Sequence, residues 1–167
     1  MPAPVIIVDY DPSWPLTFAT LRDRVAPALG DIAAAIEHVG STAVPGLAAK
    51  PVIDIDVLLT ERDAMPDAIA RLATLGYQHE GDLGVAGREA FRHIAGLPVH
   101  HLYVCAPDCA EYRRHIAFRD WMRTHPDDVR AYGALKFRLA EQFRNDREGY
   151  AIAKTQFVET ILHQAMT

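Results

Sequence analysis

The spacing of apolar positions predicts strands in the first two-thirds of the chain and helices in the last third. Residues 52–59 alternate with a period of two, and residues 89–94 and 99–105 flank a Gly-Leu-Pro turn as the strands of a hairpin would. Apolar residues recur at helical spacing over residues 15–29 and 67–75. The other expected elements are a short β-rich run at 5–8, a strand ending at 36–39, and three helices at 110–124, 127–145 and 148–166.

This order of elements predicts an α+β fold, with a mixed β-sheet, flanking helices and a C-terminal helical cap. We expect residues 1–108 to form the α+β core and residues 109–167 to pack on it as one compact unit. The composition, 50% hydrophobic and 23% charged over 167 residues, is that of a globular protein and excludes a disordered tail or a coiled-coil rod.

No apolar run approaches the roughly 20 residues of a membrane helix, and the N-terminus lacks the pattern of a secretion signal. We therefore expect no membrane partner. Two cysteines, Cys105 and Cys109, cannot make a disulfide framework, so a reducing compartment and a cytoplasmic location are expected.

The formal net charge of −5 argues against duplex DNA as a partner, because such binding depends on an excess of Lys and Arg. The charge is also uneven along the chain. Residues 1–110 carry 7 basic and 14 acidic residues, whereas residues 111–167 carry 10 basic and 8 acidic residues. An acidic first part is thus followed by a mildly basic helical part.

The segment 52–59 holds two acids, Asp54 and Asp56, between large aliphatic residues. Residues at i and i+2 share a face of a strand about 7 Å apart at Cα, so the two carboxylates can converge on one cation. Mg²⁺ favours carboxylate and phosphate oxygens. The strand pattern alone is equally compatible with an edge strand that carries two solvated acids.

Gly40, Ser41 and Thr42 follow the expected strand end at 36–39, and twelve residues separate Ser41 from Asp54. A Gly-Ser turn can present backbone N–H groups and a hydroxyl to phosphate, although a lone Gly-Ser is also a common plain turn. Followed at this interval by Asp-Ile-Asp-Val, the turn favours a phosphate site beside the two acids.

This combination resembles the nucleotidyltransferase superfamily, whose members share the DNA polymerase beta-like fold. Within it, the chain is similar to the GrpB family along essentially its whole length. The matching stretches are Tyr-Asp-Pro-Ser-Trp-Pro at 10–15, His-Val-Gly-Ser-Thr-Ala-Val-Pro-Gly-Leu at 38–47, Lys-Pro-Val-Ile-Asp-Ile at 50–55, His-His-Leu-Tyr-Val at 100–104 and Phe-Arg-Asp-Trp-Met-Arg at 118–123.

The resemblance implies a metal-dependent transfer of a nucleoside monophosphate from a nucleoside triphosphate to an unknown acceptor. Asp54 and Asp56 would be catalytic and would hold the divalent metal, most simply Mg²⁺. The superfamily's third acid belongs on a strand that here reads 99–104 and has no acid. His101 is the expected third catalytic and metal residue, which would suit Mn²⁺ or Zn²⁺ better. Substitution by Glu37 or another acid from elsewhere in the chain is the alternative.

Phosphate binding also needs basic residues opposite the metal. The expected substrate-binding residues are Gly40, Ser41, Thr42, Lys50, Arg119, Lys136 and Lys154. Arg88 and Arg92 are further basic candidates, and any of these charges could instead be solvated. The expected partner is a nucleoside triphosphate or a related small polyanion, and the oligomeric state is left open.

Two other functions stay open at this point. Loss of the third acid, and the fusion of similar domains to dephospho-coenzyme A kinase in some bacteria, favour a non-catalytic nucleotide-binding or accessory module. A phosphohydrolase that uses His100 and His101 is a weaker alternative. A zinc site at Cys105, Cys109 and His115 lacks a fourth ligand, and no P-loop motif is present.

Overall fold

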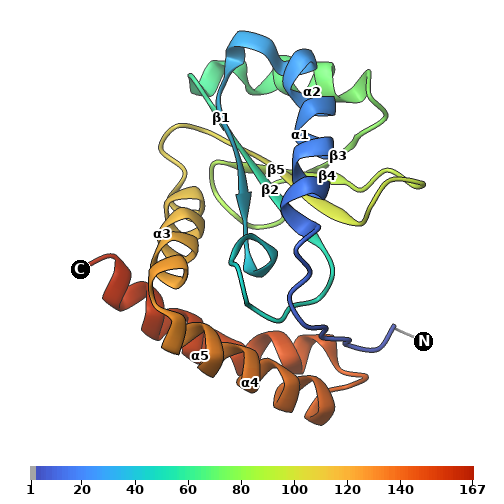
Figure 1. The fold of residues 1–167 in the computed structure, drawn as a ribbon. Coiled ribbons are helices and arrows are strands. Elements are labelled where there is room, and N and C mark those ends of the chain that lie inside the picture. The colour runs from blue at the N-terminus through green and yellow to red at the C-terminus, as the bar shows by residue number, and fades with distance from the viewer. Residues whose placement is uncertain (1–2) are drawn as a thin grey trace.

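A computed structural model describes residues 3–167, and its centre is a five-stranded mixed sheet (Figure 1). The strands are β1 (Ala33–Val39), β2 (Ile53–Leu59), β3 (Gln78–Gly81), β4 (Arg88–Arg92) and β5 (His100–Cys105), in the order β1-β2-β5-β4-β3. β2 and β5 are parallel, and the other neighbouring pairs are antiparallel. The predicted α+β fold is thus confirmed.

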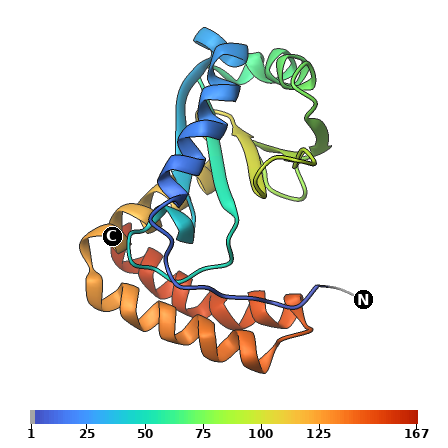
Figure 2. The same ribbon diagram turned by 45° about the vertical axis from the view of Figure 1, so that its right-hand side comes forward.

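Helices α1 (Trp14–Leu29) and α2 (Met65–Ala73) pack on one face of this sheet (Figure 2). The alternate residues Ile53, Ile55, Val57 and Leu59 of β2 form the contact, together with Leu102 and Val104 of β5. All of these side chains are buried, as the two-residue period of 52–59 requires. The acids of β2 therefore lie on the opposite face.

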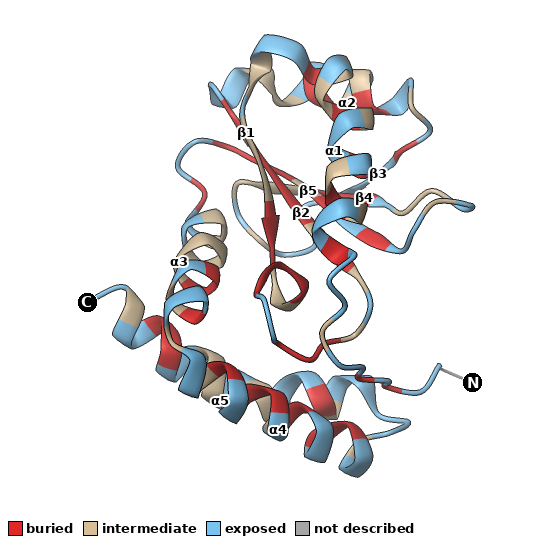
Figure 3. Ribbon diagram, in the orientation of Figure 1, coloured by how far each residue is buried: buried red, intermediate tan, exposed pale blue. Residues whose placement is uncertain are grey.

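The last third of the chain forms α3 (Ala110–Thr124), α4 (Pro126–Gln142) and α5 (Arg147–Ala165). α4 and α5 lie side by side beyond one end of the sheet, and α3 connects them to it (Figures 1 and 2). The buried positions of α4 and α5 form a stripe toward the rest of the molecule (Figure 3). These three helices agree with the predicted ones to within three residues at each end.

The long loop between β1 and β2 is shared between the two parts of the molecule. Val44 and Leu47 pack among Phe118, Met122 and other residues of the C-terminal helices. Ala48 of the same loop joins a third apolar cluster with Tyr150, Leu139 and the N-terminal Val5 and Ile7. The loop is thereby held between the sheet and the helices.

One expected strand is absent, and one observed strand was not expected. The β-rich run at 5–8 forms no strand, because it lies against the C-terminal helices and pairs through an isolated bridge between Val8 and Ala49. β3 was not expected, because Gln78, His79 and Glu80 are exposed on an edge strand and show no apolar alternation. Within residues 3–167, no helix has the length and apolar character needed to cross a membrane.

Candidate functional site

The acids of β2 face the C-terminal helices, and the parallel pairing with β5 sets their neighbours. Asp54 lies opposite His101, and Asp56 lies opposite Tyr103. His100 points to the other face, where it is fully buried and accepts a hydrogen bond from the Tyr77 hydroxyl at 2.8 Å while its Nδ1 donates to the Pro98 carbonyl. His101 is therefore the member of the histidine pair that reaches the acids.

Asp54 and His101 form the first acid–imidazole pair of the site. The Nδ1 atom of His101 donates to Oδ1 of Asp54 at 2.8 Å. This hydrogen bond raises the pKa of His101, although burial opposes it. The Nε2 atom of the same ring has no hydrogen-bond partner within residues 3–167, and the His101 side chain is exposed to solvent.

Asp56 forms a second acid–imidazole pair with a residue from a distant helix. It is completely buried, and its Oδ2 accepts a hydrogen bond of 2.6 Å from Nδ1 of His115 in α3. Burial alone would lower the pKa of His115, but the bond to Asp56 and the charges of Asp56 and Glu111 outweigh it, so the pKa is raised. Glu111 lies 3.2 Å from Nε2 of the same imidazole.

The Gly-Ser turn fits against Asp54. Gly40 has a φ of 74°, and a Cβ atom at this position would collide with Oδ2 of Asp54. Glycine is therefore required here both for the left-handed backbone and for the close approach of the carboxylate. Ser41 then begins a short 3-10 turn, Ser41–Ala43, beside the acid.

Thr42 holds this turn in place. Its hydroxyl donates to the Val52 carbonyl at 3.1 Å and accepts a hydrogen bond of 2.9 Å from Nε2 of His38. Burial of His38, which stacks on Phe18, lowers its pKa to about 4. The imidazole is thus neutral near pH 7, and the hydrogen bond to Thr42 is kept by its Nε2 proton.

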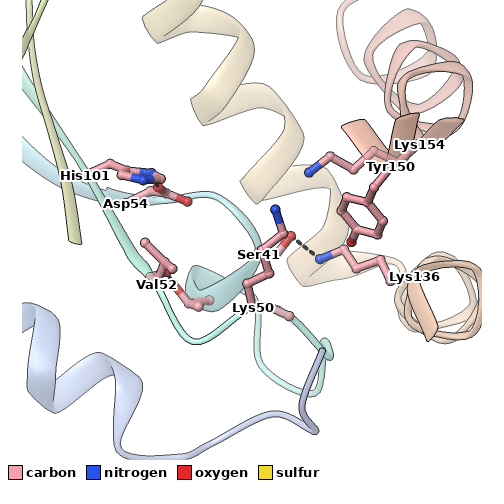
Figure 4. A pocket seen from close by; sticks show the side chains of 10 residues that line it. Ser41, Lys50, Val52, Asp54, His101, Lys136, Tyr150 and Lys154 are labelled. Atoms are coloured by element: carbon pink, nitrogen blue, oxygen red, sulfur yellow. Dashed lines mark hydrogen bonds and ion pairs between the residues drawn. The ribbon is translucent and has the colours of Figure 1, made fainter. Parts of the chain in front are cut away.

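All three lysines of the chain line one pocket beside this turn (Figure 4). Lys136 and Lys154 reach it from α4 and α5, Lys50 comes from the loop before β2, and Asp54 and His101 lie across from them. The pocket has a volume of about 220 Å³. Within residues 3–167, none of the three ammonium groups forms an ion pair with a carboxylate.

Lys136 is the most buried of these cations, with 3% of its surface exposed. Its Nζ donates to Oγ of Ser41 at 2.5 Å and to the Ala48 carbonyl at 3.1 Å. Burial, and after it the positive charge of Lys154, lower the pKa of Lys136 well below its usual value of 10.5. Burial also lowers the pKa values of Lys154 and Lys50, so this pocket disfavours its own cations in the absence of an anion.

Two residues of the site were not expected from the sequence. Tyr150 lines the pocket, and the Nζ atoms of Lys50 and Lys154 are 4.9 and 5.1 Å from its ring centroid. His115 was considered for zinc but not as the partner of Asp56. A buried acid on an otherwise apolar strand needs a hydrogen-bond donor. The sequence could therefore have predicted that a polar residue of a packed helix, such as a histidine, bonds to Asp56.

The structure brings most of the expected site residues together. Arg119 lies apart from the pocket, buried in ion pairs with Glu37 at 2.6 Å and Asp120 at 2.9 Å. Asp56 lies behind the accessible surface. The expected residues that line the lysine pocket are Ser41, Thr42, Lys50, Asp54, His101, Lys136 and Lys154, with Gly40 directly behind Asp54.

The donor chemistry fits a divalent cation in one respect. Oδ1 of Asp56 is buried without a hydrogen-bond partner within residues 3–167, which leaves a carboxylate oxygen free. The other carboxylate oxygens nearest the two histidines already accept hydrogen bonds. No group of three or more His, Cys, Asp or Glu side chains in the described part of the chain is arranged to hold an ion.

The chain is similar to proteins of one family over nearly all of its length. The family model described as GrpB protein matches residues 4–164. The UPF0157 protein PA4798 of Pseudomonas aeruginosa is 39% identical over 166 residues, which cover 96% of this chain and 67% of that protein. The UPF0157 protein YqkA of Bacillus subtilis is 31% identical, and the matched region spans less than half of it, 46%.

A solved structure supports the same relationship. The crystal structure of the conserved protein GrpB from Enterococcus faecalis superposes with a TM-score of 0.87 at 31% identity, covering 96% of this chain and 97% of that one. The dephospho-CoA kinase of Mycolicibacterium paratuberculosis is 27% identical over 91% of this chain and 44% of its own length. Because the family model matches residues 4–164 and a solved GrpB structure shares the fold, the chain belongs to the GrpB family.

Proposed function

We propose that the lysine pocket binds the phosphates of a nucleoside triphosphate or a related small polyanion. The observation that carries this proposal is the convergence of Lys50, Lys136 and Lys154 on one pocket, where no carboxylate among residues 3–167 forms an ion pair with them. Buried ammonium groups without counter-ions are costly, and an anion with several oxygens removes that cost. The Ser41 hydroxyl adds a neutral donor beside the lysines.

We further propose that the bound nucleotide is a substrate for nucleotidyl transfer. Asp54 lines the lysine pocket and places a carboxylate and the His101 imidazole beside the expected phosphates. The acceptor's hydroxyl oxygen would bond to the α-phosphorus while the bond from that phosphorus to the β-bridging oxygen breaks, releasing pyrophosphate. The hydroxyl proton would pass to the Asp54–His101 pair.

The proposed cofactor is a divalent metal, most simply Mg²⁺, with Mn²⁺ or Zn²⁺ as alternatives favoured by an imidazole ligand. Asp54, Asp56 and His101 would hold it, and it would neutralise charge on the phosphate oxygens. The residues of the chain supply the rest: the lysines orient the phosphates, and the Gly40 turn fixes the carboxylate of Asp54.

A non-catalytic binding module on the same fold is the second candidate. It is favoured by the hydrogen bonds that both acids accept from histidines, because these bonds occupy carboxylate oxygens that a catalytic metal ion would need. The similarity to part of a dephospho-CoA kinase also supports an accessory role, with coenzyme A precursors among the ligands to test.

One series of measurements separates these functions. Thermal shift with nucleoside triphosphates, tripolyphosphate and coenzyme A precursors, with and without Mg²⁺ or Mn²⁺, identifies a ligand because ligands that bind the native state raise Tm. Release of pyrophosphate from the ligand found, lost in Asp54→Asn, supports transfer. Binding without pyrophosphate release supports the module, and a failure of every polyanion to bind overturns both.

A further inference from the structure

A second pocket lies on the other side of Asp54 from the lysines. It has a volume of about 150 Å³ and is lined by Val39, Gly40, Asp54, Arg88, Tyr103 and His115. Asp54 therefore forms part of the wall of both pockets. Any group bound in the second pocket would face the phosphates in the first across this one carboxylate.

Arg88 gives the second pocket its character. Its guanidinium lies over the Tyr103 ring, with Cζ 4.2 Å from the ring centroid, which places the charged group in a cation–π contact. The Nε atom of Arg88 is buried and has no hydrogen-bond partner within residues 3–167. Arg88 lines the pocket, and the planar N–H groups of a guanidinium suit bidentate binding of phosphate or carboxylate.

The nearby acids do not neutralise Arg88. Glu89, the next residue, pairs with His79 at 3.0 Å, and Glu80 on β3 pairs with Arg92 at 3.6 Å. The acids of β2 are bonded to His101 and His115. Arg88 is thus a charged side chain, partly buried beside the acid pair, for which the described residues supply no ion-pair partner.

We propose that the Arg88 pocket binds an anionic group of the acceptor, a phosphate or a carboxylate. This assignment of the acceptor class rests on the proposed function, in which the lysine pocket holds the donor. The acceptor would then be an anionic small molecule, oriented by Arg88 with its nucleophilic oxygen toward Asp54. The two clusters of positive charge, on either side of Asp54, would each hold one substrate.

The test follows the Nε–H signal of Arg88 by ¹⁵N–¹H correlation NMR. The signal is identified by its absence in Arg88→Gln, or in Arg88→Lys if the first variant does not fold. The protein is saturated with tripolyphosphate, and then inorganic phosphate or acetate is added at constant ionic strength. Arg92→Gln is the matched control, because Arg92 lies on the same strand but is exposed and paired with Glu80.

We expect the Arg88 signal to shift saturably with phosphate, acetate or both, whichever anion the acceptor carries. Calorimetry measures the second binding in the variants, because Arg88→Gln lacks the Arg88 signal. Arg88→Gln should weaken this binding by at least about tenfold while tripolyphosphate still binds, and Arg92→Gln should not weaken it. The proposal is overturned if the signal does not shift, if tripolyphosphate alone shifts it fully, or if Arg92→Gln has an equal effect. Failure of tripolyphosphate to bind would instead count against the proposed function, and the Arg88 titration remains readable without it.

Discussion

The ammonium group of Lys136 lies 2.5 Å from the hydroxyl of Ser41, although 95 positions of the chain separate the two residues. This hydrogen bond joins helix α4 to the turn after β1, which is the position where the two parts of the chain form the pocket. Because Lys136 is buried and carries a lowered pKa, it is the residue whose charge depends most on a bound anion.

Replacing Lys136 by Met should remove a large part of the affinity for tripolyphosphate. A hydrogen bond to a charged group contributes about 1.5–3 kcal/mol, so we expect roughly a tenfold to hundredfold rise in Kd by calorimetry. The free energy of unfolding should change little, because the cost of burying the amine is removed together with its hydrogen bonds to Ser41 and the Ala48 carbonyl. Arg138→Met on the same helix, at an exposed position, is the control, and an equal loss there would contradict the assignment.

Anion binding should be accompanied by proton uptake. The pKa values of Lys136, Lys154 and Lys50 are lowered by burial, and a bound polyanion raises them again. At any pH between the lowered values and 10.5, binding therefore adds protons, and affinity falls as the pH rises through this window. Calorimetry in two buffers of different ionisation enthalpy measures the uptake, which should shrink in Lys136→Met. Equal heats in both buffers would show that the lysines are already charged in the free protein.

Replacing Gly40 by Ala should destabilise the protein by more than backbone strain alone. Gly40 and Gly84 both have left-handed φ angles, 74° and 83°, but a Cβ atom meets Asp54 at Gly40 and nothing within 4 Å at Gly84. Each Ala variant should lose about 1–3 kcal/mol from strain, and Gly40→Ala should lose more and should also weaken tripolyphosphate binding. Urea unfolding measures the difference. Identical losses in the two variants would mean that Asp54 moves aside freely.

Lowering the pH should reduce the free energy of unfolding because His38 becomes protonated. Its pKa is lowered to about 4 in the fold against 6.5 when unfolded, so the unfolded chain takes up a proton first as the pH falls. The stabilisation is present above pH 6.5 and is lost as the pH falls toward 4, by about 3 kcal/mol. The difference between the free energies of unfolding at pH 7 and at pH 4.5 should therefore be smaller in His38→Gln than in His163→Gln. The second variant is the control, because His163 is exposed. A wild-type slope retained in His38→Gln would assign the effect to other groups.

The strands that bury one apolar face could be predicted from the sequence, and so could the acids on the other face of β2, because a period of two is decided locally. The polar edge strand β3 could not, since its pairing depends on β4 rather than on its own residues. The run at 5–8 has strand-forming residues but no strand beside it, so its tertiary surroundings override its propensity.

The same distinction applies to the site. The Gly-Ser turn and the acid strand are close in sequence, and their meeting was predictable from spacing. Lys136 and Lys154 enter the pocket from two different helices, and His115 bonds to Asp56 from a third. These positions depend on how α3, α4 and α5 pack. Arg119 has the expected residue type but is bonded to Glu37 and Asp120, which no local pattern indicates.

The loop from Gly40 to Val52 makes the folding of the sheet region depend on the C-terminal helices. Val44 and Leu47 are fully buried, and the side chains that cover them belong to α3, α4 and α5. A fragment cut after residue 108 would expose these side chains at the base of the turn that begins at Gly40. The C-terminal helices therefore hold the turn in its conformation. A truncated protein that kept every residue of the sheet would still lack a formed pocket.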